Sequence, residues 1–165
     1  MECVELPSTL RRIEYNAFNS CANLKNVELP EHLEYIGAGV FRESGLQSVM
    51  FPDSLRAVAK RAFFGCKELR TVVLNEGLEV LGCSENDNEK ELRGMVFAGC
   101  GIDNIRIPST LKVIEAATFL GCKNLKNVEL SEGLEKIGVA AFVQIGVENI
   151  VLPASTKVLA AEAFG

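Results

Sequence analysis

Phenylalanine recurs through this sequence at an almost constant interval and so forms a repeat column. Its members are Phe18, Phe41, Phe63, Phe97, Phe119, Phe142 and Phe164. They follow one another at 22 or 23 residues, apart from a single step of 34 residues between Phe63 and Phe97. Because self-similarity at a fixed period of about 20–50 residues is the mark of a repeat architecture, this column restricts the fold to a stack of similar units.

A second column predicts one short strand in each unit. It alternates apolar and variable residues at Val4/Leu6, Val27/Leu29, Val49/Phe51, Val72/Leu74, Ile105/Ile107, Val128/Leu130 and Ile150/Leu152, a pattern typical of β-structure. All five prolines directly follow these segments, at Pro7, Pro30, Pro52, Pro108 and Pro153, where a residue without an N–H ends a ladder. One such unit cannot bury its own core, so neighbours must stack with parallel strands. We expect a solenoid of about seven repeats of 22–23 residues.

The step from the phenylalanine to the next strand alternates between two lengths. The long steps carry a C-x-x-L motif at Cys21–Leu24, Cys66–Leu69 and Cys122–Leu125. The short steps carry a glycine and an aliphatic residue at Gly45-Leu46, Gly101-Ile102 and Gly146-Val147. The true period is therefore a pair of repeats, 45 residues long, which residues 83–93 interrupt as an insertion.

The pattern L-P-x-x-L-x-x-I-x-x-x-A-F-x-x-C-x-x-L-x-x-V-x-L resembles the BspA-like (Treponema-type) leucine-rich repeats. It is carried by residues such as Leu29-Pro30, Leu33, Ile36 and Val40-Phe41, and by Ala62-Phe63, Cys66, Leu69 and Val72. The likeness covers residues 3–165. It implies an α/β-type repeat solenoid, a right-handed superhelix with a parallel β-sheet on its concave side, as one domain over residues 1–165.

The same resemblance implies a function and a location. Members of the family are found mostly on the surface of bacteria and some protists, where they are associated with adhesion to host, matrix or other cells. We therefore expect a module that binds a matrix, serum or cell-surface protein, outside the cell or on its surface. A cytoplasmic scaffold for protein–protein interactions stays open as the alternative, since six cysteines without an N-x-S/T site suit a reducing compartment.

Other classes of function find little support in the sequence. The single histidine, His32, lies in an expected turn without a nucleophile or ligand partner, so we expect no enzyme and no cofactor. The net charge is −5 and no cluster of Lys and Arg occurs, which argues against nucleic acid as a partner. No apolar run approaches the roughly 18–20 residues that span a bilayer, so no membrane insertion is expected in this segment.

The ends of the sequence suggest a fragment. Its first residues lie inside a strand unit, and it stops in mid-repeat at Ala163-Phe164-Gly165. Neither end shows the polar capping repeat that a free solenoid end needs. We expect either a parent protein that is longer than these 165 residues or open ends that pair between chains.

Four of the six cysteines, Cys21, Cys66, Cys100 and Cys122, share one repeat column. Stacked parallel positions keep their Cβ atoms near 4.8 Å, beyond the usual disulfide separation of about 3.5–4.5 Å. No C-x-x-C pair suggests a zinc site either. We therefore expect a column of reduced, buried thiols, with Cys3 and Cys83 outside it as the reactive ones.

The outward positions of the strands form the first candidate binding surface, on the expected concave face. Its candidate residues are Glu28, Met50, Thr71, Val73, Asn104, Arg106, Asn127 and Glu129. Met50 and Val73 place apolar groups beside Arg106, a mixture that interface hot spots favour. The alternative is that these are scattered exposed apolar residues without a role.

The insertion is the second candidate. Its polar residues are Glu85, Asp87, Glu89, Lys90 and Glu91. Insertions in repeat proteins form loops on one face, often the binding face, so a loop that contacts a partner and a merely solvated loop both stay open. The acidic oxygens do not have the spacing of a twelve-residue EF-hand loop, and we expect no metal site.

Overall fold

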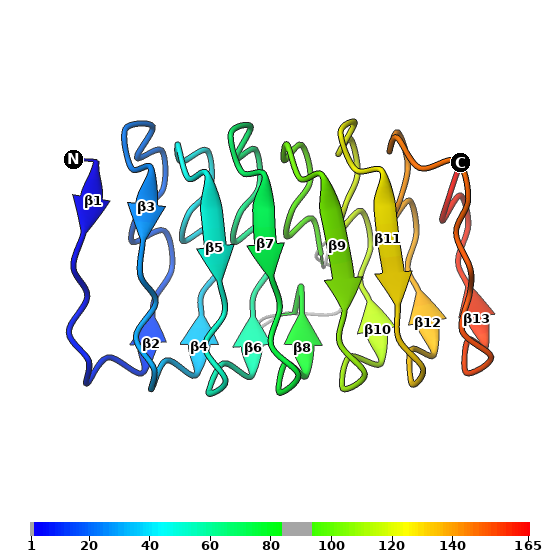
Figure 1. Cartoon of the computed structure of the whole chain (residues 1–165), viewed down its shortest axis with the longest axis horizontal. Helices are drawn as coiled ribbons and strands as arrows, with labels where there is room; N and C mark the ends of the chain where they lie inside the picture. Colours follow the sequence, from blue (N-terminus) through cyan, green and yellow to red (C-terminus); the bar gives the residue numbers. More distant parts are fainter. Residues whose placement is uncertain (1, 84–93) are drawn as a thin grey trace.

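The residues that the structure describes form thirteen short strands on two faces of a solenoid. The strands of one face run in the direction opposite to those of the other face (Figure 1). The computed structural model describes residues 2–83 and 94–165. The first face carries β1 (Cys3–Val4), β3 (Asn26–Val27), β5 (Ser48–Met50), β7 (Thr71–Val73), β9 (Asn104–Ile107) and β11 (Asn127–Leu130). The second face carries β2 (Arg12–Ile13), β4 (Tyr35–Ile36), β6 (Ala57–Val58), β8 (Val80–Leu81), β10 (Val113–Ile114), β12 (Lys136–Ile137) and β13 (Val158–Leu159).

Parallel pairing joins strands of neighbouring coils, with breaks in the ladder between β3 and β5 and between β8 and β10. On the first face Ser48 pairs with Thr71, Thr71 with Asn104, and Asn104 with Asn127, so β5, β7, β9 and β11 form one sheet. These pairings confirm the parallel solenoid and the expected register. The pattern did not predict the two-residue strands of the second face, which are too short to show an alternation.

Two parts of the expected fold are not confirmed. The residues that the structure describes contain no helix, because turns and two-residue strands fill the return path of each coil; the α/β description does not hold there. The strand expected at 149–152 does not form, and Val151 is 84 % exposed. The first face therefore has six strands rather than seven.

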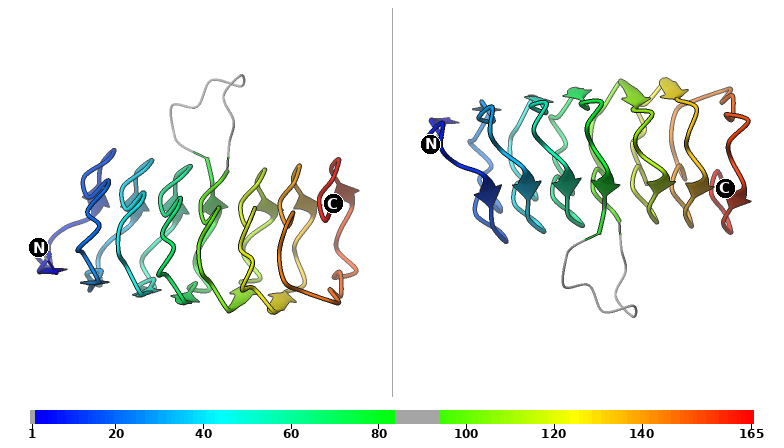
Figure 2. Two further views of the ribbon diagram at one scale, coloured as in Figure 1. Left: turned by 90° about the horizontal axis from the view of Figure 1, so that it is seen from above. Right: turned by 90° about the horizontal axis from the view of Figure 1, so that it is seen from below.

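The coils stack in an almost straight row, with the two ends of the chain at opposite ends of the stack (Figures 1 and 2). Both views of Figure 2 show little curvature along this row. The first face is thus broad and nearly flat, whereas the resemblance implied a concave one. A flat face suits contact with a similarly flat partner.

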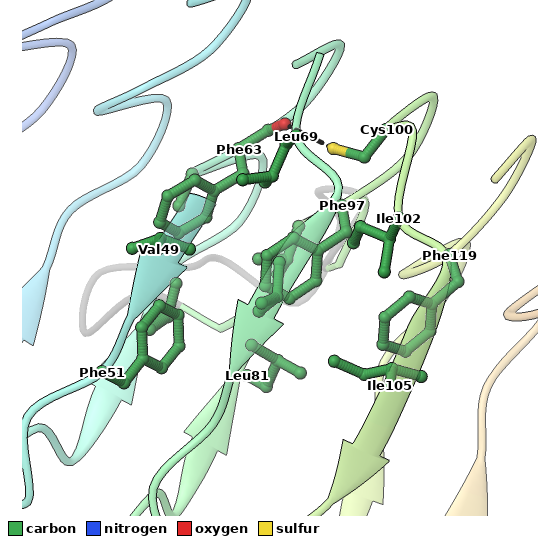
Figure 3. Packing of buried hydrophobic residues seen from close by; sticks show 14 of the residues in the cluster. Val49, Phe51, Phe63, Leu69, Leu81, Phe97, Cys100, Ile102, Ile105 and Phe119 are labelled. Atoms are coloured by element: carbon green, nitrogen blue, oxygen red, sulfur yellow. Dashed lines mark hydrogen bonds between the residues drawn. The ribbon is translucent and has the colours of Figure 1, made fainter. Parts of the chain in front are cut away.

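The phenylalanine column forms a continuous stack inside the solenoid. Successive rings from Phe18 to Phe164 lie with centroids 5.3–5.7 Å apart. The turns that carry them are also bonded from coil to coil: the N–H of Phe41 donates to the carbonyl of Ala62 at 2.7 Å, and that of Phe63 to Val96 at 2.9 Å. Figure 3 shows the rings of Phe63, Phe97 and Phe119 in one row. Each ring from Phe18 to Phe142 is therefore fixed by its backbone as well as by its neighbours.

Close contact between coils explains the alternation of step lengths. A Cβ added at Gly45 would lie 2.1 Å from the carbonyl oxygen of Ala22, and one added at Gly101 would lie 2.4 Å from that of Lys67. A Cβ added at Gly146 would likewise lie 2.7 Å from the carbonyl oxygen of Lys123. Each long C-x-x-L turn therefore directs a carbonyl at the next coil, and only glycine leaves room for it.

The cysteine column serves hydrogen bonding between coils. The thiol of Cys66 donates to the carbonyl of Phe41 at 2.9 Å, that of Cys100 to Phe63 at 3.0 Å, and that of Cys122 to Phe97 at 3.1 Å. Figure 3 shows the Cys100 bond. All six cysteines are free thiols, and these three are buried. The expectation of reduced, buried thiols is confirmed for them, while Cys21 is only half-buried.

Thiol labelling of the folded protein should separate these groups. Burial raises the pKa of Cys122 to about 12 from an ordinary 9.0, and burial likewise raises that of Cys100. Cys3 is exposed, and Cys21 and Cys83 are half-buried, so we expect at most these three thiols to react fast under native conditions. All six should react in denaturant. Four or more fast-reacting thiols in the folded chain would contradict the assignment.

Candidate binding groove

A shallow groove of about 550 Å³ lies on the first face, over β7, β9 and β11. Six of the eight residues predicted for binding line it: Thr71, Val73, Asn104, Arg106, Asn127 and Glu129. The other two, Glu28 and Met50, line a second depression of about 650 Å³ beside β3 and β5. The structure thus divides the predicted surface between two neighbouring hollows of one face.

The strand alternation places these side chains in solvent. In β7 and β9 the central residues Val72 and Ile105 are buried, so their neighbours along each strand point outward. Val73 is 44 % exposed and Met50 is 69 % exposed, and the two are paired across β5 and β7. An exposed apolar pair therefore borders the groove.

Arg106 is held in place by carboxylates from two other coils. Its Nη1 lies 2.5 Å from Oε1 of Glu76, and its Nε lies 3.6 Å from Oε2 of Glu129. Glu76 also accepts a hydrogen bond from the N–H of Ser109 at 3.2 Å. This N–H and the guanidinium of Arg106 hold the pKa of Glu76 below its ordinary value, so the carboxylate stays charged at neutral pH. The guanidinium is thus oriented before any partner arrives.

Amide side chains line the floor of the groove between its charged residues. Nδ2 of Asn127 donates to Oδ1 of Asn104 at 2.5 Å. This bond uses one N–H of Asn127 and the Oδ1 of Asn104, which leaves the other N–H of Asn127 and both N–H groups of Asn104 as donors for a partner. The groove therefore offers neutral hydrogen-bond donors beside the apolar pair and the fixed Arg106.

Three charged contributors were not predicted from the sequence. Arg70 and Lys126 line the groove from the position before each strand, and Glu76 fixes Arg106 from the turn after β7. The column that precedes the strands reads Glu2, Lys25, Gln47, Arg70, Asp103, Lys126 and Glu148. The charged residues of this column were the sequence signal from which Arg70 and Lys126 could have been predicted. The Glu76 contact depends on a turn conformation that no pattern encodes.

The remaining predicted residues lie elsewhere. Those of the insertion, Glu85, Asp87, Glu89, Lys90 and Glu91, fall outside the described residues. His32 lies in the turn after β3, exposed, with Nε2 3.6 Å from Oε1 of Glu31. Within 2–83 and 94–165 no group of three or more His, Cys, Asp or Glu could hold a metal ion. The same residues include no helix that could cross a membrane.

The family of the chain follows from its repeats. The model of the BspA type Leucine rich repeat region matches residues 1–90 and 83–165, in six copies. The chain belongs to this family. Leucine-rich repeats are typically non-catalytic protein-interaction modules that bind through the surface formed by their stacked coils.

Solved structures share the fold. A leucine-rich repeat protein from Bacteroides ovatus is 29 % identical over 94 % of this chain, with a TM-score of 0.83. The leucine-rich repeat protein of T. pallidum is 25 % identical over 96 %, with a TM-score of 0.79. The chain spans 38 % of the first of these proteins and 73 % of the second. No curated protein matches the sequence.

A third structure shows the same fold at lower identity. It is a leucine rich cell surface protein from Faecalibacterium prausnitzii, 18 % identical over 99 % of this chain and with a TM-score of 0.58; the chain covers 58 % of it. At this identity the likeness is one of fold alone.

Proposed function

We propose that the chain is an adhesive protein-binding module that works at a cell surface, and that the groove over β7, β9 and β11 is its contact site. The observation that carries the proposal is the combination of exposed Val73 with Arg106, whose guanidinium two carboxylates hold in place. Apolar groups beside an oriented arginine are what protein-interface hot spots use. Catalysis is not part of the proposal.

Two further points support the proposal, one on location and one on the kind of partner. The BspA-type family is associated with adhesion, and a protein described as a cell surface protein shares the fold. The groove also lacks aromatic residues, since its lining contains neither Phe, Tyr nor Trp. Sugar-binding sites commonly stack sugar rings on aromatic faces, so this lining favours a polypeptide partner.

The test is binding of the immobilised chain to a panel of matrix and serum proteins, with fibronectin and fibrinogen included. Val73→Glu combined with Arg106→Glu should abolish saturable binding, because it removes the apolar contact and reverses the oriented charge. We expect the affinity to fall at least about 100-fold, because two hot-spot side chains are lost together. Circular dichroism should show an unchanged fold, since both side chains are exposed.

The matched control lies on the second face. Val80→Glu combined with Lys136→Glu makes the same change in charge at two other exposed strand positions. This variant should bind like the wild type. Equal loss in both variants, or binding that neither variant weakens, would contradict the assignment of the groove.

A further inference from the structure

We propose that the partner of the first face is a second copy of this chain, docked face to face about a two-fold axis that runs parallel to the strands between β5 and β7. This inference rests on the proposed function of the first face and names its partner. Such an axis keeps the strand direction and reverses the order of coils. It therefore places β7 of the second copy over β5, β9 over β3, and β11 over β1.

The charges of this face are complementary under that operation. The facing pairs of opposite charge are Glu2 with Lys126, Lys25 with Asp103, and Glu28 with Arg106. All six side chains belong to exposed residues, and the symmetry makes each pair occur twice. Within one copy Nζ of Lys25 also lies 3.3 Å from Oε1 of Glu2, so these two residues meet Asp103 and Lys126 of the other copy as a group of four alternating charges. One like pair, Glu5 with Glu129, remains, and Glu129 is partly neutralised by the Nε of Arg106 at 3.6 Å. Complementary potentials of this kind determine which partners associate.

The apolar residues fall at the centre of the same arrangement. Met50 of one copy lies over Val73 of the other, on both sides of the axis. At 69 % and 44 % exposure they are the large hydrophobics that the strands β1 to β11 of this face leave open. An apolar centre with a charged rim is the anatomy of a protein interface, and a symmetric contact needs such a self-complementary patch.

Neighbouring registers lose this match. With the axis moved onto β7, Lys25 would face Lys126 and Glu2 would face Glu148, so that both pairs would repel. With the axis between β7 and β9, Val73 would face Arg106 and Met50 would face Glu129. Only the axis between β5 and β7 opposes unlike charges and joins the apolar residues at once. The nearly flat face permits it, because two sheets pack about 10 Å apart.

The experiment is sedimentation velocity from about 5 µM to about 500 µM, a range suited to a small interface. We expect a concentration-dependent dimer that weakens between about 0.05 M and about 0.5 M salt. Lys25→Asp should weaken it at least about tenfold, because each dimer then holds two like-charged pairs with Asp103. Lys25→Asp combined with Asp103→Lys restores opposite charges at the original net charge and should restore the dimer.

The outcomes separate this inference from the proposed function. Lys25 lies outside the groove, so Lys25→Asp should lose the dimer and keep any binding to matrix proteins. That result would support the homophilic contact and the proposed function separately. A chain that stays monomeric throughout overturns the homophilic contact, as does a dimer insensitive to Lys25→Asp or not rescued by the double change. In each of those cases, binding to another protein that Val73→Glu/Arg106→Glu abolishes would leave the proposed function standing.

Discussion

Phe63→Ala is expected to lower the free energy of unfolding by about 3–5 kcal/mol, the usual cost of removing a fully buried aromatic side chain. Phe63 is not exposed at all. Its ring centroid lies 5.3 Å from those of both Phe41 and Phe97, and Phe51 contacts it from the first face at 5.9 Å. The alanine variant would leave a cavity between two coils, which rigid neighbours on both sides cannot fill.

The neighbouring Phe64 provides the control. It lies outside the column, is half-buried, and contacts the guanidinium of Arg42 at 5.5 Å. Phe64→Ala should cost about 1 kcal/mol or less, mostly the loss of a partly solvated cation–π contact. Urea unfolding followed by circular dichroism measures both variants. Equal losses, or a Phe63→Ala curve like that of the wild type, would falsify the central place of the stack.

The repeat made the core predictable. The phenylalanine and strand columns each place one kind of residue at one depth in the coils, so their period alone located Phe63 and Val72 in the interior. The strands of the second face were not predicted, because a strand of two residues, such as Ala57–Val58, is too short to show a period of two. The segment 149–152 carries the expected alternation at Ile150 and Leu152, yet it forms no strand.

The site was less predictable than the core. Alternation told which strand residues face outward, and six of those predicted line one groove. It could not show that Glu76 orients Arg106, because that contact crosses from the turn after β7 to the next coil. Nor could it show how flat the first face is. Flatness arises from small rotations between coils that side-chain patterns do not encode.

The 45-residue period gives the second large effect, Gly45→Ala, which should cost about 2–3 kcal/mol as an overpacked contact. The added Cβ would lie 2.1 Å from the carbonyl oxygen of Ala22 and 3.0 Å from its carbonyl carbon. A backbone shift that relieves this clash would strain two bonds between coils, Gly45 N–H to Cys21 at 3.3 Å and Gln47 N–H to Lys25 at 3.0 Å. The added methyl group therefore cannot be accommodated without straining these hydrogen bonds.

Gly121→Ala separates this clash from the cost of an unusual backbone. Gly121 has φ +72°, yet the nearest atom to its added Cβ is 4.0 Å away, so the substitution should cost only about 1 kcal/mol through the left-handed conformation. Thermal and urea unfolding of the two variants compare the two causes directly. If Gly45→Ala cost no more than Gly121→Ala, the clash with the carbonyl of the long turn would not explain why glycine occupies the short steps. The larger loss at Gly45 would instead tie the alternation of C-x-x-L and glycine turns to the packing of one coil against the next.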